Sequence, residues 1–296
     1  MSGIEKLVDT HCHPTDSDNV NLSEHTRKMH AVCAMSTHIE DQDKVRELYK
    51  GYPDKVIPYY GYHPWWSHLF TFEENISKEE HYESILLDGK KDDIKREQLR
   101  GLLDTLPMPI LFQNLLIDIE ERLQDNPRAQ VGEVGIDRVF RVKGEDGKLT
   151  ILQPSIEHQK RVAVAQVKLA KKYNRLVSMH SVSATQGSLD IIRAADYQRI
   201  VLHSCGIGHN AITAARKEFP DIYFGFSKAI NARSMSLLED SISVTPLNRI
   251  LTESDFYDEA HFPVQVGEMV DIIARIKDES RDFIVNKVKT NFDELF

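Results

Sequence analysis

The chain of 296 residues carries 37 lysines and arginines against 46 aspartates and glutamates, which gives a formal net charge of -9. This acidic balance excludes a general nucleic-acid-binding protein with a basic stripe, but not an enzyme that binds nucleic acid at a small site. The hydrophobic fraction of 41% is enough for one large α/β domain or two small ones.

Cysteine usage and hydropathy bear on the compartment. The three cysteines show no regular spacing, which excludes a disulfide framework and favours a reducing compartment. The N-terminal residues show no charged segment followed by an apolar one, and no apolar run approaches the ~18 residues that a membrane-spanning helix needs. We therefore expect a cytoplasmic protein, with the nucleus as the alternative, that has no contact with a membrane.

Eight short apolar segments, rich in β-branched and aromatic residues, recur along the chain and alternate with segments of helical character. We expect strands at 6–13, 31–37, 56–64, 129–137, 176–181, 199–205, 222–227 and 250–255. Such alternation produces parallel βαβ units, and eight of them predict a closed (β/α)8 TIM barrel that forms one domain over residues 1–296. A doubly wound open sheet is the alternative, but no Gly-x-Gly-x-x-Gly motif follows the first strand.

Helices are predicted between these strands. The clearest is 154–173, where Pro154 stands at the start and apolar residues recur with helical spacing. The segments 211–219 and 263–278 show the same pattern.

The connection between the third and fourth strands is long and strongly charged. Its apolar pattern at 99–106 and 110–123 predicts helices, so we expect a helical insertion at 66–128. Charged segments are mostly solvated faces, so the insertion is expected to cover the barrel wall. A module that binds a protein partner is the alternative.

Ionisable side chains fall at the carboxyl ends of six predicted strands, where the active sites of (β/α)8 barrels lie. They are His11, His13, His63, Glu133, His180, His203 and Asp255. A single histidine on an apolar strand is more often a hydrogen-bonded core residue. Five histidines and two carboxylates at equivalent positions instead indicate one common site.

The spacing of these residues suggests a metal centre. Residues two apart on a strand face the same side, so His11 and His13 are expected to face the barrel interior and bind one divalent ion. Glu133 can bridge to a second ion, and its neighbour Asp137 is expected to hold a ligand by a hydrogen bond.

The remaining strand-end residues complete the expected ligand set. His180 and His203 would hold the second ion, while Asp255 would complete the first or orient the attacking water. Such nitrogen and carboxylate ligands suit Zn²⁺, Mn²⁺, Fe²⁺ or Mg²⁺, with one or two ions per chain.

Over essentially its whole length the chain resembles the TatD-type metal-dependent hydrolases. The motifs that carry the resemblance are DTHCHP, GYHP, VGEVGID, the strand with His180, VLHSCG and LTESD. The resemblance implies a (β/α)8 barrel, one or two divalent ions and deoxyribonuclease activity on DNA. By motif it implies metal ligation by His11, His13, Glu133, His180, His203 and Asp255.

The resemblance also implies a mechanism in which a metal-activated water attacks phosphorus. Asp255 would accept or orient the proton of the water, Glu133 would bridge the ions, and His63 would stabilise charge on the substrate phosphate.

Some positions depart from the family's motifs. Val182 stands where the family has an arginine that can pair with phosphate, and Phe256 stands where it has an alanine. We expect Lys228, just after the seventh strand, to replace the missing cation; a surface lysine is the alternative. Trp65 is expected either to stack on a substrate base or to wall the pocket.

Three functions therefore compete. The leading interpretation is a TatD-like deoxyribonuclease with DNA as substrate. An amidohydrolase or deacylase acting on a small or aminoacyl substrate is the nearest rival, because the same metal chemistry can attack a carbonyl group. The third is a weakly active or inactive barrel that binds a protein partner through 66–128.

Overall fold

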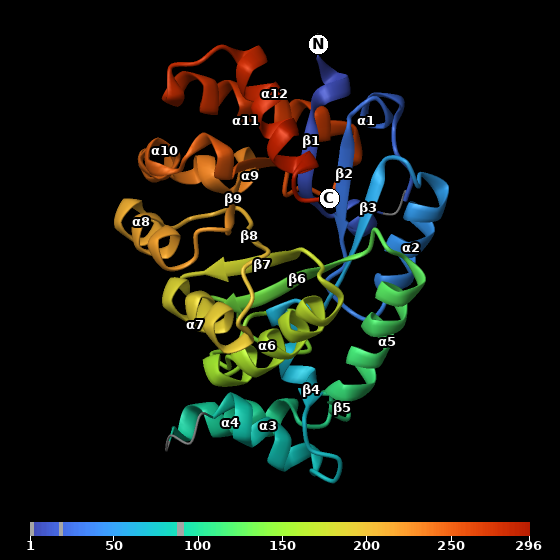
Figure 1. Cartoon of the computed structure of the whole chain (residues 1–296). Helices are drawn as coiled ribbons and strands as arrows, with labels where there is room; N and C mark the ends of the chain where they lie inside the picture. Colours follow the sequence, from blue (N-terminus) through green and yellow to red (C-terminus); the bar gives the residue numbers. More distant parts are fainter. Residues whose placement is uncertain (1–2, 18–19, 88–91) are drawn as a thin grey trace.

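A computed structural model describes residues 3–17, 20–87 and 92–296. Eight parallel strands form one sheet (Figure 1). In sheet order they are β1 (Val8–Cys12), β2 (Ala31–Met35), β3 (Val56–Tyr60), β6 (Gln130–Asp137), β7 (Val177–Val182), β8 (Ile200–Leu202), β9 (Tyr223–Ser227) and β10 (Ile250–Glu253). Each lies within or within one residue of an expected strand, so the eight predicted strands are confirmed.

The two outer strands of this sheet, β1 and β10, come together and nearly close the barrel. The hydroxyl of Thr10 donates to the carbonyl oxygen of Thr252 at 3.1 Å, and the hydroxyl of Thr252 donates to the carbonyl oxygen of Val8 at 3.1 Å. The amide of Asp255 donates to the carbonyl oxygen of His11 at 2.9 Å. The fold is therefore the predicted (β/α)8 barrel, and closure places the ends of the first and last strands together.

Helices cover the outside of the strands. They are α1 (Glu24–Arg27), α2 (Gln42–Gly51), α5 (Phe112–Asp125), α6 (Ile156–Tyr173), α7 (Thr185–Ala195), α8 (His209–Glu218), α9 (Lys228–Asn231), α10 (Met235–Val244), α11 (Phe262–Lys277) and α12 (Arg281–Asp293). The helices expected at 154–173, 211–219 and 263–278 correspond to α6, α8 and α11. None of the helices that the structure describes is long and apolar enough to span a bilayer.

Alternating strand residues build two core layers. On β2, Val32 and Ala34 pack with residues of the surrounding helices, whereas Cys33 and Met35 pack inside the barrel with residues of other strands. Period-two alternation in a sheet that is covered on both faces explains why every residue of β2 is buried.

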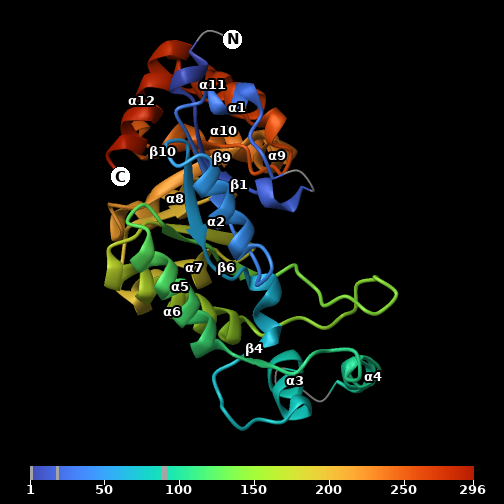
Figure 2. The same cartoon turned by 90° about the vertical axis from the view of Figure 1, so that its right-hand side faces the viewer.

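Between β3 and β6 the chain forms η3 (Pro64–Leu69), β4 (Phe70–Thr71), α3 (Lys78–Leu86), α4 (Asp93–Leu102), β5 (Ile110–Leu111) and α5. Helices α3 and α4 stand apart from the strands (Figure 2) and share a small core with the loop that follows β6. The short strands β4 and β5, which pair with each other, are an element that we did not expect. Residues 88–91 of the expected 66–128 insertion lie outside the described residues.

Candidate metal centre

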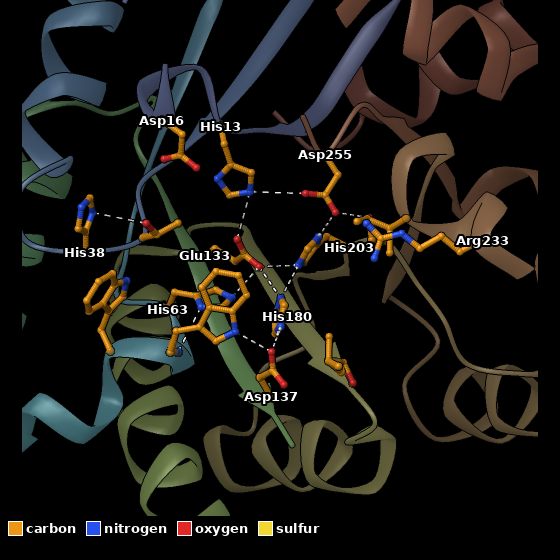
Figure 3. A pocket seen from close by; sticks show the side chains of 17 residues that line it. His13, Asp16, His38, His63, Glu133, Asp137, His180, His203, Arg233 and Asp255 are labelled. Carbon is orange, nitrogen blue, oxygen red and sulfur yellow. Dashed lines mark hydrogen bonds and ion pairs between the residues drawn. The ribbon is translucent and has the colours of Figure 1, made fainter. Parts of the chain in front are cut away.

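The carboxyl ends of the strands surround a cavity of about 500 Å³. Most of the residues expected at strand ends line it, namely His13, His63, Glu133, His180, His203 and Asp255. His11 is fully buried beside them. Figure 3 shows His13, His63, His180 and His203 around the carboxylate of Glu133. The structure therefore brings all seven strand-end residues together.

The end of β1 brings two imidazoles to one point. Nε2 of His11 lies 3.1 Å from Nε2 of His13, and Nδ1 of His11 lies 2.7 Å from Oγ of Ser178. Because the hydroxyl oxygen of Ser178 can accept a hydrogen bond from an N–H at Nδ1, the lone pair on Nε2 of His11 is free to face the cavity. Strict strand alternation does not place these rings, since β1 ends at Cys12 and its register with β2 shifts after Asp9.

The carboxylate of Glu133 faces two groups of histidines with its two oxygens. Oε2 lies 3.4 Å from Nε2 of His11 and 3.4 Å from Nε2 of His13. Oε1 faces the other group: Nδ1 of His180 at 2.6 Å, Nε2 of His203 at 2.7 Å and Nε2 of His63 at 3.3 Å. This is the arrangement that a carboxylate bridging two ions requires.

Gly135 allows strands β6 and β7 to lie close together, which brings Glu133 near His180. Gly135 has a φ of 153°, and a Cβ atom there would overlap the carbonyl oxygen of His180 on β7. Only glycine therefore lets the two strands come this close. The peptide bond between Gly132 and Glu133 is cis.

Asp255 lies beside the imidazole rings of His11 and His13. Its Oδ1 lies 3.5 Å from Nε2 of His13 and 4.0 Å from Nε2 of His11. Its Oδ2 accepts a hydrogen bond from Oγ of Ser204 at 2.5 Å. The residue has a φ of 49°, a left-handed conformation that aspartate adopts more readily than most residues. The turn after β10 thus aims one carboxylate oxygen at the pair of imidazoles.

Three sets of donor atoms in this cluster could each hold a metal ion, because the atoms of each set lie within 4.8 Å of one another. The sets are His11, His13 and Asp255; His11, Glu133 and His203; and His63, Glu133 and His180. Metal–nitrogen bonds of ~2.0–2.1 Å place neighbouring ligands roughly 3–3.5 Å apart, which is the spacing found between several of these atoms. The chemistry and spacing of the donors therefore fit a divalent ion.

The electrostatics of the cluster separate two kinds of histidine. Burial lowers the pKa of His11 to about 3 and that of His63 to about 4, so both are neutral at neutral pH. Burial also acts to lower the pKa of His13, but the hydrogen bond with Asp255 and the charge of Glu133 raise it to about 9.

His180 behaves like His13, because the charge of Glu133 and the hydrogen bond with Asp137 outweigh burial and raise its pKa to about 9. For Glu133 itself, burial acts to raise the pKa, but the surrounding imidazoles hold it well below its usual range. Without a bound ion the cluster thus carries its compensating positive charge as protons on histidine.

Asp137 connects the cluster to the rim of the cavity. Its Oδ2 accepts a hydrogen bond from Nε1 of Trp65 at 2.6 Å and lies 3.4 Å from Nε2 of His180. Its Oδ1 accepts from the backbone amides of Val139 and Phe140. Asp137 therefore fixes both the His180 ring and the Trp65 indole, which fits the role expected for it in orienting a ligand.

Of the three residues expected to bind substrate, His63 and Trp65 line the cavity, whereas Lys228 does not. Nζ of Lys228 pairs with Oε2 of Glu268 on α11 at 2.7 Å, and Lys228 does not line the cavity. Arg233, which the sequence did not single out, lines it instead, as do His38 and Val182. No pattern in the sequence marks Arg233, because it lies in a short irregular segment after β9.

Comparison with known proteins extends these observations. The sequence model of the family described as "TatD related DNase" matches residues 8–296. The Cut9-interacting protein scn1 of Schizosaccharomyces pombe is 26% identical, over 97% of this chain and 98% of its own length. An uncharacterized deoxyribonuclease of Saccharomyces cerevisiae is 28% identical, over 86% of this chain and 84% of its own.

Solved structures agree on the fold. A TatD homologue from Escherichia coli superposes with a TM-score of 0.65 at 21% identity, over 99% of this chain and 98% of that chain. A TatD family hydrolase from Entamoeba histolytica superposes with a TM-score of 0.60 at 14% identity, over 92% of this chain and 86% of that chain.

Proposed function

The chain belongs to the TatD-related DNase family, and on that premise we propose that it is a divalent-metal-dependent deoxyribonuclease that hydrolyses phosphodiester bonds of DNA. The observation that carries the proposal is the position of Glu133, whose two oxygens face separate groups of histidines beside Asp255. Two adjacent divalent ions are suited to hydrolysis at phosphorus.

The residues that would hold the ions follow from the contacts of Glu133. His11, His13 and Asp255 would hold one ion and His180 and His203 the other, with Glu133 between them. A divalent ion bound there lowers the pKa of water and neutralises charge on phosphate oxygens. The donor set suits Zn²⁺, Mn²⁺ or Fe²⁺, and also Mg²⁺ if water completes its shell.

Asp255 would take the proton of the attacking water. Burial acts to raise the pKa of Asp255, but the hydrogen bond with His13 and the nearby imidazoles hold it below its usual range, so the carboxylate is ionised at neutral pH. Ser204 holds Oδ2, which leaves Oδ1 directed at the cavity. As water attacks phosphorus, its proton passes to Asp255, and the leaving oxygen of the broken P–O bond takes a proton from solvent.

His63 would contact the substrate phosphate. Its Nδ1 accepts a hydrogen bond from the backbone amide of Trp65 at 3.2 Å, so in the neutral ring the proton lies on Nε2. That N–H lies 3.3 Å from Oε1 of Glu133 in a residue that lines the cavity, and it would turn to a phosphate oxygen when substrate binds. Trp65 is 46% exposed and its indole is fixed by Asp137, which gives a base a rigid surface on which to stack.

The test is a comparison of substrates with the metal-loaded protein. We expect cleavage of a single-stranded oligonucleotide, loss of cleavage in Asp255→Asn, and full cleavage in the control Asp146→Asn, which changes an exposed carboxylate. Turnover of amides or carboxylic esters without cleavage of DNA would support the amidohydrolase alternative instead.

A second candidate function rests on α3 and α4. The relative from Schizosaccharomyces pombe is named for its interaction with another protein, and Ile94 and Met108 in this region are each 64% exposed. We propose that the region 66–128 binds a protein partner. If so, Ile94→Ser with Met108→Ser abolishes co-purification of the partner while Asp255→Asn does not; the reverse result would refute this role.

A further inference from the structure

Arg233 occupies a distinctive position in the cavity. Among the residues that the structure describes, it is the only lysine or arginine that lines the cavity, whereas four carboxylates do so: Asp16, Glu133, Asp137 and Asp255. Figure 3 shows Arg233 on the side where His203 and Asp255 lie, with His38 on the other side. One cationic side chain thus stands at the edge of an otherwise acidic site.

The backbone segment that carries Arg233 is hydrogen-bonded to the loop that follows the candidate ligand His203. Asn231 is 8% exposed, and its Nδ2 donates to the carbonyl oxygens of Ser204 at 3.0 Å and Cys205 at 3.2 Å. Its Oδ1 accepts from the amide of Ser227 at 2.8 Å. These bonds fix the segment after β9 to the loop that follows His203, so the position of Arg233 is set by the same loop that places a candidate ligand.

The local helix geometry then turns Arg233 toward the cavity. Arg233 lies in η4 (Ala232–Ser234), directly after α9. Residues three apart share a face in such turns, and Ile230 and Arg233 both line the cavity. Lys228, the other cation of this segment, is instead held by Glu268.

Arg233 has no partner of its own within the described parts of the chain. Its guanidinium forms no ion pair or hydrogen bond there. Two of the carboxylates that line the cavity with it have other contacts: Asp255 accepts from Ser204 and contacts His13, and Asp137 accepts from Trp65. A free guanidinium beside a site that fits divalent ions is suited to an anion, and its planar array of donors matches the oxygens of a phosphate.

We propose that Arg233 binds the non-bridging oxygens of the substrate phosphate and selects an anionic phosphodiester over a neutral ester or amide. This inference rests on the proposed function and names the residue that gives it its substrate class. Val182, at the end of β7, lines the same cavity with an apolar side chain, so the cation at this cavity comes from Arg233 in the segment after β9.

The test measures binding of inorganic phosphate to the metal-loaded protein by titration calorimetry. We expect the Kd to rise about 5- to 20-fold in Arg233→Ala and less in Arg233→Lys, which keeps a point charge but loses the planar fork. The matched control is Arg275→Ala, which removes a surface arginine that pairs with Glu239 on α10. Metal content, measured by elemental analysis, should be equal in all variants.

A kinetic measurement separates this inference from the proposed function. In Arg233→Ala we expect a raised KM for a single-stranded oligonucleotide, whereas the control Arg275→Ala should keep the KM of the wild type. If the wild type cleaves no DNA but its phosphate affinity depends on Arg233, the proposed function fails and the phosphate site stands. If the wild type cleaves DNA and Arg233→Ala changes neither Kd nor KM, the inference about Arg233 is overturned. A larger loss in Lys228→Ala than in Arg233→Ala would also overturn it.

Discussion

The Nε2 atoms of His11 and His13 lie 3.1 Å apart at the edge of the cavity. Each is 3.4 Å from the same oxygen of Glu133. Three donor atoms at such spacing around one point match the spacing of ligands around one divalent ion.

Metal binding should release protons. Without an ion, the pKa values of His13 and His180 are about 9, so both rings are protonated at pH 7.5. A ligating histidine must be neutral, so a cation displaces these protons and the apparent metal affinity rises with pH up to about 9. Calorimetric titration with metal in buffers of different ionisation enthalpy measures the release. Affinity that does not change between pH 6 and 9 would refute this charge assignment.

Asp137→Asn should weaken metal binding. Asp137 stabilises the N–H at Nε2 of His180, which leaves Nδ1, 2.6 Å from Glu133, to face the cluster. Loss of such a partner typically costs ~10–100-fold in metal affinity. Competition with a chromogenic chelator measures the change, and Asp146→Asn in an exposed loop is the control. Equal affinities in the two variants would show that Asp137 does not orient His180.

Gly135→Ala should be strongly destabilising. A Cβ atom at this position would overlap the carbonyl oxygen of His180, and the φ of 153° is itself unfavourable for alanine. We expect a loss of about 3 kcal/mol or more in the free energy of unfolding, measured by urea denaturation. Gly101→Ala in α4 is the control, because nothing lies within 4 Å of the added atom. That change should stabilise the helix by about 0.5–1 kcal/mol, and similar denaturation midpoints for the two variants would contradict the close approach of β6 and β7.

The stability of the metal-free protein should fall between pH 6.5 and about 4. Burial lowers the pKa of His158 to about 4, and its Nε2 lies 2.9 Å from the carbonyl oxygen of Ser67 beneath the His63 loop. Below pH 6.5 His158 binds a proton in the unfolded chain, whereas in the folded chain it stays neutral down to about pH 4. The free energy of unfolding therefore decreases as the pH falls through this window. The contribution of this histidine is at most ~3 kcal/mol.

His158→Gln separates this effect from other titrating groups. Glutamine keeps an N–H donor near Ser67 but does not titrate, so the slope of unfolding free energy against pH should flatten. His25→Gln, which alters an exposed histidine, should leave the slope as in the wild type. Denaturation in the presence of a chelator measures both, and equal slopes in the two variants would show that His158 is not the responsible group.

The strands and their terminal residues were predictable because both are local features of the sequence. Each strand is a short apolar segment with a break at its end, and parallel strands bring their carboxyl ends to one edge of the barrel. That is sufficient to group Glu133 with Asp255, although 122 residues separate them in the sequence and the two come together only through closure of β1 against β10.

The substrate side of the site was only partly predictable: His63 and Trp65 line the cavity as expected, but tertiary contacts place its other residues. Lys228 was expected at the cavity, but Glu268 on α11 holds it elsewhere. Arg233 reaches the cavity because Asn231 binds the loop after β8. His38, which was not among the candidate site residues, also lines the cavity, stacked on Trp66 with a ring-centroid distance of 5.3 Å. Apolar spacing marks neither Arg233 nor His38, although His38 directly follows the strand predicted at 31–37.

The most direct test of the metal-dependent nuclease is the cleavage of a single-stranded oligonucleotide by chelator-treated protein during titration with Zn²⁺, Mn²⁺ or Mg²⁺. We predict no cleavage before an ion is added, cleavage that rises to a plateau as the wild type is loaded, and a rate at least ~100-fold lower in Glu133→Gln at the same ion concentration. Cleavage that needs no ion, or that proceeds equally in Glu133→Gln, would contradict the account.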